Sequence, residues 1–197
     1  MNSPRRRSDR PLEFFKGFLR NPKEVGSLIP SSRFLTRRVL KCGDAKTARV
    51  IIELGPGTGV LTREILEQMP ADGTLIAVEL LPEFVELLAR AYPDPRLTLY
   101  NGSSADLEKA LAEAGEVQAD LVVSGIPFST MERGEGRRTL EAAKRILAPG
   151  GLFVAYQFRS AVRRMAEPVF GPAETRAEFR NLPPMRVYTF RRDAVPR

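Results

Sequence analysis

A glycine-rich turn at residues 53–59 constrains the fold of this chain more than any other stretch. It reads Glu-Leu-Gly-Pro-Gly-Thr-Gly, follows the apolar run Val50, Ile51 and Ile52, and precedes apolar residues at helical spacing. This order predicts a strand, a tight turn and a helix. Glycines at three alternate positions allow positive φ angles and a close approach of the backbone to a ligand, because they carry no Cβ. The N–H groups that open the helix then face that ligand.

The spacing of these glycines and of a later acidic residue limits which ligand the turn can bind. A dinucleotide fingerprint needs a glycine at the sixth position, which is Val60 when counted from Gly55, and the chain lacks the Gly-Lys-Ser/Thr of a P-loop. The next predicted strand, residues 74–78, ends on Glu79, whose carboxylate can accept both hydroxyls of a ribose. We therefore expect a nucleoside-containing ligand. The alternative is a glycine turn that binds nothing.

Length and composition favour a globular fold without disulfides or metal. A chain of 197 residues is long enough to bury a core of its own. Cys42 is the single cysteine and there is no histidine, which excludes an internal disulfide and histidine-based acid–base catalysis and argues against a zinc site. The sequence shows no signal-peptide pattern and no apolar run long enough to cross a bilayer, so we expect a cytoplasmic location.

Charge is distributed unevenly along the chain, whose formal net charge is +7. Residues 1–41 carry 11 basic and 3 acidic side chains, residues 42–158 carry 11 and 17, and residues 159–197 carry 9 and 4. An acidic body with basic ends predicts a polyanionic partner, either nucleic acid or an anionic membrane. A solvated basic surface without a partner is the alternative.

The basic segment of residues 1–41 contains a predicted amphipathic helix at residues 11–20. In a helical projection, Lys16 and Arg20 fall on one side. The other side consists of Leu12, Phe14, Phe15, Phe18 and Leu19. Such a helix can lie in a membrane interface, or its apolar face can pack on the protein's own core. The positive charge of this segment favours the membrane, and we expect Phe14, Phe15, Phe18 and Leu19 to bind it.

Residues 42–197 alternate between strands and helices, which predicts an α/β fold with a mostly parallel sheet. Ser31 or Ser32 is placed to N-cap a helix at residues 33–41. Further strands are expected at residues 96–100, 119–124 and 152–158. Helices that cover both faces of the sheet are expected to begin at Pro82 and to occupy residues 105–114 and 136–147. Residues 175–192 predict a final antiparallel hairpin around Pro183 and Pro184.

The stretch Gly125-Ile126-Pro127-Phe128-Ser129 is the candidate for the chemical step. It follows the strand at residues 119–124, and ligands of open parallel sheets bind beyond the carboxyl ends of the strands. Phe128 can present its ring to a cationic centre. Alternatively, this ring packs in the core as an ordinary apolar side chain.

These features resemble the S-adenosylmethionine site of class I methyltransferases, which share the Rossmann-like fold predicted here. The helix at residues 14–19, the segment Val-Gly-Ser-Leu-Ile-Pro-Ser-Ser-Arg at residues 25–33 and the segments 52–59 and 124–128 are similar to soluble bacterial phospholipid N-methyltransferases. The resemblance implies methylation of phosphatidylethanolamine by a peripheral protein on the inner face of the cytoplasmic membrane. It implies that S-adenosylmethionine is held by Glu53, Gly55, Gly57, Gly59, Glu79, Ser103, Ser104 and Gly125. Phe128 and Tyr156 would line the pocket for methyl transfer.

The ribosomal RNA adenine dimethyltransferases are a related group, and an enzyme like them, or another RNA or small-molecule methyltransferase, is the main alternative. Those enzymes carry Asn-Leu-Pro-Tyr/Phe where this chain has residues 125–128, and usually Asp where it has Ser103. They also carry a C-terminal RNA-binding domain, for which residues 159–197 leave little room. Nucleic acid is therefore the less favoured partner. An inactive cofactor-binding protein at the membrane is the second alternative.

The expected reaction is direct displacement, in which a neutral amine takes the sulfonium methyl group. Catalysis of this kind rests on positioning in a shaped, partly dry site. The sequence assigns neither the group that accepts the proton from the amine nor the oligomeric state. Four arginines are candidates to hold a lipid phosphate: Arg33, Arg159, Arg163 and Arg164.

Overall fold

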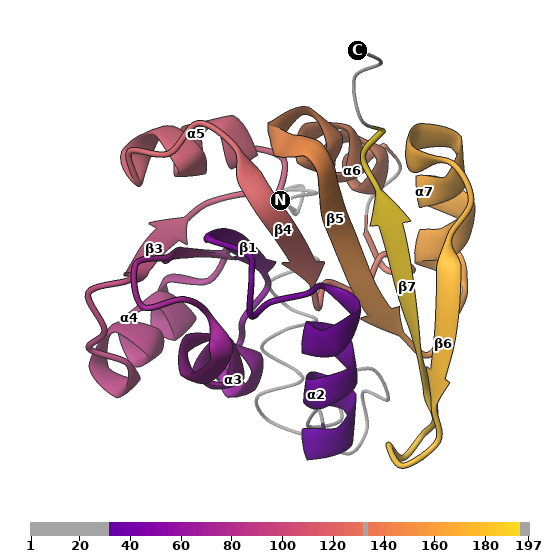
Figure 1. The fold of residues 1–197 in the computed structure, drawn as a ribbon, viewed down its shortest axis with the longest axis horizontal. Coiled ribbons are helices and arrows are strands. Elements are labelled where there is room, and N and C mark those ends of the chain that lie inside the picture. The colour runs from indigo at the N-terminus through magenta and orange to yellow at the C-terminus, as the bar shows by residue number, and fades with distance from the viewer. Residues whose placement is uncertain (1–31, 132–133, 194–197) are drawn as a thin grey trace, which may run out of the picture. The chain divides into compact units, whose positions relative to one another are not determined.

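The computed structural model describes residues 32–131 and 134–193, which form a seven-stranded sheet in the order β3-β2-β1-β4-β5-β7-β6 (Figure 1). Five of these strands run parallel, namely β1 (Val50–Leu54), β2 (Thr74–Glu79), β3 (Leu97–Asn101), β4 (Ala119–Ser124) and β5 (Leu147–Gln157). The last two, β6 (Glu174–Glu178) and β7 (Met185–Arg191), form a hairpin that pairs antiparallel with β5. The predicted mostly parallel α/β sheet with a C-terminal hairpin is confirmed.

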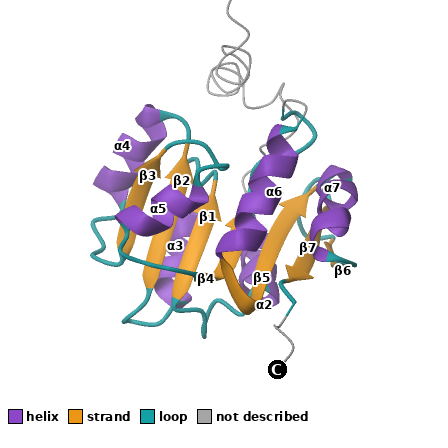
Figure 2. Cartoon of the chain, turned by 90° about the horizontal axis from the view of Figure 1, so that it is seen from above, coloured by secondary structure: helices purple, strands orange, loops and turns teal. Residues whose placement is uncertain are grey.

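Helices cover both faces of this sheet (Figure 2). On one face, α2 (Arg33–Cys42) and α3 (Val60–Gln68) contribute to an apolar core with Ile51, Leu121 and Val154. On the other face, α5 (Leu107–Glu113), α6 (Glu135–Ile146) and α7 (Ala161–Phe170) enclose a second core around Val122 and Phe153. The remaining helix among the described residues, α4 (Pro82–Ala91), packs on β2 and β3.

The two cores follow from the alternation of side chains along buried strands. Ile51 belongs to one core and its neighbour Ile52 to the other, and both are fully buried. Leu121 and Val122 of β4 repeat this pattern. Parallel strands covered on both faces need apolar side chains at successive positions, which is why the strands read as continuous apolar runs. The only charged side chain of β1, Glu53, therefore lies in an otherwise apolar layer.

The helix before the glycine turn begins with one of the two predicted caps. Ser32 is the N-cap of α2, and its Oγ accepts a hydrogen bond from the Leu35 N–H at 3.3 Å. The buried side chains Leu35 and Val39 of this helix belong to the core beneath the sheet. The domain boundary predicted after residue 41 stays a prediction, although α2 shares this core with the strands. The predicted helix at residues 11–20 lies outside the described residues.

Two further elements differ from the sequence prediction. Helix α7 was not predicted, and it contains Pro168 one turn before its end at Gly171. Strand β5 begins at Leu147 rather than residue 152, and the pairing of β4 with β5 shifts register between Ala119 and Leu121. The turn predicted at residues 149–151 is thus part of an irregular strand start, where Gly150 has a φ of 80°.

Candidate active site

The glycine turn connects β1 to α3 and presents its backbone at the carboxyl edge of the sheet. Gly55, Gly57 and Gly59 have φ angles of 69°, 55° and 80°, which L side chains rarely adopt. A Cβ on Gly59 would lie 2.4 Å from the Tyr92 ring and 2.6 Å from Leu88, so this glycine lets α3 pack against α4. A Cβ on Gly57 would meet no atom within 4 Å. Gly57 therefore marks the open side of the turn, where a ligand can approach.

Glu79 ends β2 and faces this turn. Its Oε2 accepts a hydrogen bond from the Gly57 N–H at 3.2 Å, and its Oε1 accepts one from the Leu81 N–H at 3.0 Å. The side chain is 3% exposed, and this burial raises the pKa of Glu79 against the opposing effect of the two N–H donors. Each carboxylate oxygen keeps a lone pair for a further donor. Glu79 is thus held rigidly next to Gly57, in a position where it can accept hydroxyl hydrogen bonds.

Glu53 lies beneath the turn, within the core. Its Oε2 accepts a hydrogen bond from the Thr62 hydroxyl of α3 at 2.7 Å, and both residues are buried. Burial raises the pKa of Glu53 to about 7, an effect that the Thr62 hydrogen bond opposes and the nearby Glu79 carboxylate increases. A group with this pKa changes its charge near neutral pH. The sequence did not point to Thr62 as its partner, because a threonine in a helix is unremarkable on its own.

Two of the residues predicted to hold the cofactor, Ser103 and Ser104, lie after β3. Asn101 donates from Nδ2 to the backbone oxygens of Glu79 and Leu80, which joins the ends of β3 and β2. Ser103 is half-buried, and its Oγ accepts a hydrogen bond from the Ala105 N–H at 3.1 Å. The Ser104 Oγ is buried and lies 2.9 Å from the Thr139 Oγ1 of α6. Ser103 can still donate a hydrogen bond, whereas the Ser104 hydroxyl is already engaged with α6.

Gly125 brings the loop after β4 against the glycine turn. Its N–H donates to the Leu54 carbonyl oxygen at 3.0 Å. A Cβ at this position would lie 2.7 Å from the Tyr156 Oη and 3.4 Å from the Gly55 carbonyl oxygen. Gly125, Tyr156 and Gly55 therefore meet at the carboxyl ends of β4, β5 and β1. An asparagine could occupy position 125 only if Tyr156 moved.

The rest of this loop is fixed by groups that the sequence did not single out. The buried Gln157 donates from Nε2 to the Ile126 carbonyl oxygen at 2.7 Å. Phe128 is 3% exposed, and its ring packs edge-on to Phe153 with 6.4 Å between centroids. Core packing thus accounts for the Phe128 ring, and its role at the methyl group stays a prediction. Gln157 could not be recognised from sequence, because its partner is 31 residues away.

The four candidate arginines lie in different settings. Arg163 forms an ion pair with Glu167 at 2.7 Å, and Arg164 donates to the Ser160 Oγ. Arg33 lies over the Phe34 ring, 5.0 Å from its centroid. Arg159 is exposed directly after β5. The predicted membrane-binding residues Phe14, Phe15, Phe18 and Leu19 lie outside the described residues.

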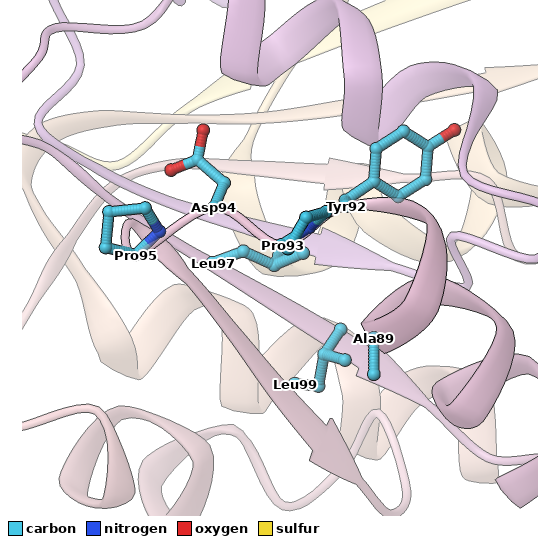
Figure 3. Close-up of a pocket in the computed structure, with 7 residues that line it drawn as sticks. All are labelled: Ala89, Tyr92, Pro93, Asp94, Pro95, Leu97 and Leu99. Atoms are coloured by element: carbon cyan, nitrogen blue, oxygen red, sulfur yellow. The ribbon is translucent and has the colours of Figure 1, made fainter.

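The described residues contain neither a metal-ligand cluster of His, Cys, Asp or Glu nor a helix of the length and apolarity that crossing a membrane requires. A shallow pocket lies elsewhere, where the loop after α4 meets the edge strand β3 (Figure 3). Its lining is Ala89, Tyr92, Pro93, Asp94, Pro95, Leu97 and Leu99. None of the residues predicted to bind the cofactor belongs to it, and it includes the amino end of β3 rather than the carboxyl edge. We therefore assign no chemistry to this pocket.

The chain is similar to known methyltransferases along most of its length. A family model described as a methyltransferase domain matches residues 51–151. The ornithine lipid N-methyltransferase of Singulisphaera acidiphila is 32% identical over 181 residues, which cover 89% of this chain and 92% of that protein. The ribosomal RNA small subunit methyltransferase A of Chlorobium luteolum is 34% identical over 107 residues, which cover 54% of this chain but 37% of that enzyme.

Solved structures share the fold at low sequence identity. The N-methyltransferase NodS from Bradyrhizobium japonicum, in complex with S-adenosyl-L-homocysteine, superposes with a TM-score of 0.68 and 14% identity over 91% of this chain and 98% of that one. In the present chain, the open side of Gly57 and the carboxylate of Glu79 lie together at the carboxyl edge of the sheet. The chain therefore belongs to the class I methyltransferases that use S-adenosylmethionine, and within them to the family of bacterial lipid N-methyltransferases.

Proposed function

We propose that this protein methylates the primary amine of a membrane lipid head group, with phosphatidylethanolamine as the substrate. The observation that carries the proposal is the similarity to a lipid N-methyltransferase over 89% of this chain and 92% of that protein. A match over 89% of the chain has to include the loop after β4, and not the glycine turn alone. This matters because one fold serves many acceptors, and the acceptor is set by the residues of the site.

The site residues divide the work of binding and positioning. The backbone of Gly55, Gly57 and Gly59 would approach the cofactor closely, Glu79 would accept its ribose hydroxyls, and Ser103 would contact the adenine. Bound S-adenosylmethionine supplies an activated methyl group on a sulfonium sulfur. Gly125 and Tyr156 border the point where that group would meet the amine, and the Gln157 bond to Ile126 keeps this loop in place. Such positioning of two reactants supplies most of the rate in displacement reactions.

Ornithine lipid is a second candidate acceptor, because the relative from Singulisphaera acidiphila is named for it. Ornithine lipid and phosphatidylethanolamine share a primary amine and a nearby anionic group, a carboxylate in one and a phosphate in the other. An arginine can pair with either anion. Arg159, which is exposed two residues after β5, is the candidate that lies nearest to Tyr156 along the chain.

Ribosomal RNA is a weaker candidate. The match to the RNA methyltransferase covers 37% of that enzyme, so most of its length has no counterpart here. The asparagine that those enzymes use for the adenine amino group would clash at position 125, where Tyr156 lies 2.7 Å from a Cβ. The basic segments of the chain then suit an anionic membrane. We propose peripheral binding at the inner face of the cytoplasmic membrane, with Phe14, Phe15, Phe18 and Leu19 in contact with lipid.

A transfer assay with labelled S-adenosylmethionine tests the proposal. The purified full chain is incubated with phosphatidylglycerol vesicles that also contain phosphatidylethanolamine or ornithine lipid, and separately with ribosomal RNA. We expect label in the phosphatidylethanolamine, and none in phosphatidylglycerol vesicles that lack an amine. Label in ornithine lipid alone would change the acceptor, and label in RNA alone would refute lipid methylation. A chain that binds cofactor and labels none of them would support the inactive alternative.

A further inference from the structure

Three large apolar side chains are exposed at one corner of the described structure. Phe179 and Leu182 lie in the connection between β6 and β7 and are 78% and 84% exposed. Phe158, directly after β5, is 50% exposed. Exposed aromatic and leucine side chains that gather on one projecting loop are unusual on a surface that meets only water.

This corner belongs to the same edge of the sheet as the cofactor site. Gln157, at the carboxyl end of β5, pairs with Arg186 at the start of β7. The Arg186 Nη1 also donates to the Phe158 carbonyl oxygen at 3.3 Å. In Figure 1, the arrows of β4 and β5 point toward the side of the sheet at which the β6–β7 connection lies, and this connection projects beyond the ends of both strands. Its tip therefore extends past the edge at which Gly125 and Tyr156 lie.

The tip is braced by α2. The Ser32 N–H donates to the Asn181 Oδ1 at 3.0 Å, and the buried Glu178 carboxylate accepts bonds from Arg38 and Arg180. These contacts hold the start of the connection at Glu178 and its middle at Asn181, so Phe179 and Leu182 flank a residue that is bonded to α2. An exposed apolar side chain on a braced loop keeps its orientation toward a partner, which lowers the entropy lost on binding.

Positive charge surrounds the apolar tip. Segments 32–38, 157–160 and 178–186 together carry six arginines and one glutamate. That glutamate, Glu178, is buried and paired, so the solvent side is basic. Arg180 also lies over the Phe34 ring, with 4.3 Å between the guanidinium carbon and the centroid. Apolar side chains at a tip with arginines behind them match the layers of an anionic bilayer, where acyl chains lie beneath charged head groups.

We propose that this surface, which we call the hairpin tip and define as Phe158, Phe179 and Leu182 with Arg33, Arg159, Arg180 and Arg186, docks on an anionic lipid bilayer. The proposal rests on the proposed lipid substrate, and it adds a membrane contact within residues 32–193 to the one predicted for residues 11–20. Docking through the tip turns the carboxyl edge of the sheet toward the head groups. A lipid amine then reaches Tyr156 without leaving the bilayer.

Vesicle co-sedimentation of the full chain tests the hairpin tip. The double variant F179S/L182S removes the two most exposed side chains of the tip and touches no predicted cofactor residue. Its matched control is V117S, because Val117 is 85% exposed but precedes β4 and thus lies at the opposite edge of the sheet. We expect the double variant to bind phosphatidylglycerol vesicles at least tenfold more weakly, and V117S to bind as the unchanged protein does.

Two further readouts separate this proposal from the proposed function. Calorimetry with S-adenosylhomocysteine is expected to give the same affinity for all three proteins, which shows that the variants are folded. Vesicle binding needs no methyl transfer, so the contrast between the variants holds even if no lipid takes up label. Equal vesicle affinity of F179S/L182S and the unchanged protein, or an equal loss in V117S, overturns the docking proposal. It is also overturned if the double variant changes only self-association in sedimentation equilibrium, since the tip would then bind a second copy.

Discussion

The buried carboxyl group of Glu53 predicts a stability that falls as pH rises, and Glu53→Gln removes this effect. Glu53 is 2% exposed and accepts a hydrogen bond from the Thr62 hydroxyl at 2.7 Å. Burial is the main cause that raises its pKa to about 7 from the ordinary 4.5. A glutamine has nearly the same shape and its Oε1 can accept the same bond from Thr62. The substitution therefore removes the charge and leaves the packing.

The sign follows from proton binding in the two states. Between pH 4.5 and about 7 the folded chain keeps the Glu53 proton that the unfolded chain has lost. The folded state binds more protons in this window, so the free energy of unfolding decreases as pH rises. At about 1.4 kcal/mol per pKa unit, the loss over the whole window is about 3 kcal/mol. The variant lacks this loss. Between acid and a pH above 7, the difference between the two free energies of unfolding therefore shifts by about 3 kcal/mol in favour of the variant.

Urea denaturation of both proteins at a series of pH values measures this difference. We expect the free energy of unfolding of the unchanged protein to approach and then fall below that of the variant as pH rises. The Thr62→Val variant serves as a second probe, because loss of the hydrogen bond raises the pKa of Glu53 further and extends the fall to higher pH. Two curves with a constant separation from acid to pH 8 would show that folding does not raise the pKa of Glu53, and the reasoning from burial would be wrong.

Three other substitutions test the site and its surroundings. Glu79→Ala should weaken S-adenosylhomocysteine binding at least tenfold in calorimetry, because it removes the ribose acceptor. The control Glu83→Ala, on the exposed side of α4, should leave this affinity unchanged. Equal affinities of the Glu79→Ala variant and the unchanged protein would exclude the ribose role. Gly125→Ala should lower methyl transfer by roughly tenfold, since about 1 Å of misplacement can cost more than this, and the loss should shrink in a Tyr156→Phe background that lacks the clashing Oη. Glu178→Gln should destabilise the fold by at most about 3 kcal/mol at neutral pH, because Arg180 and Arg38 lower the pKa of Glu178 from 4.5 to about 2. This contribution is present above pH 4.5 and is lost as pH falls toward 2, so thermal melts of the two proteins should converge in acid.

The glycine turn and Glu79 could be predicted because local spacing alone specifies them. Positive φ angles at Gly55, Gly57 and Gly59 require glycine, and the next strand of a βαβ unit has to end beside the turn. The N-cap at Ser32 is a local signal of the same kind. Such features depend on residues that are near in sequence or on a fixed unit of the fold, and the structure places them together.

The contacts that complete the site could not be predicted because they join distant segments. Gln157 reaches Ile126 over 31 residues and Ser104 meets Thr139 over 35, and no pattern in one sequence pairs them. Helix α7 was missed because Pro168 lies in its last turn, and a proline beyond the first turn is unfavourable in a helix. The Phe128 ring shows the same limit, since a loop aromatic can face a ligand or the core, and Phe153 and Gly136 surround it here.

The direction of β7 explains how one edge of the sheet can hold both the cofactor site and the hairpin tip. The carboxyl ends of the parallel strands β1, β4 and β5 meet at a single edge, which gathers Gly55, Gly125 and Tyr156. Because β7 pairs antiparallel with β5, it starts at this same edge, and the connection from β6 has to turn there. A parallel last strand would have started at the opposite edge, and its preceding connection would project away from the site. The antiparallel hairpin therefore places Phe179 and Leu182 at the edge where a lipid amine would have to enter.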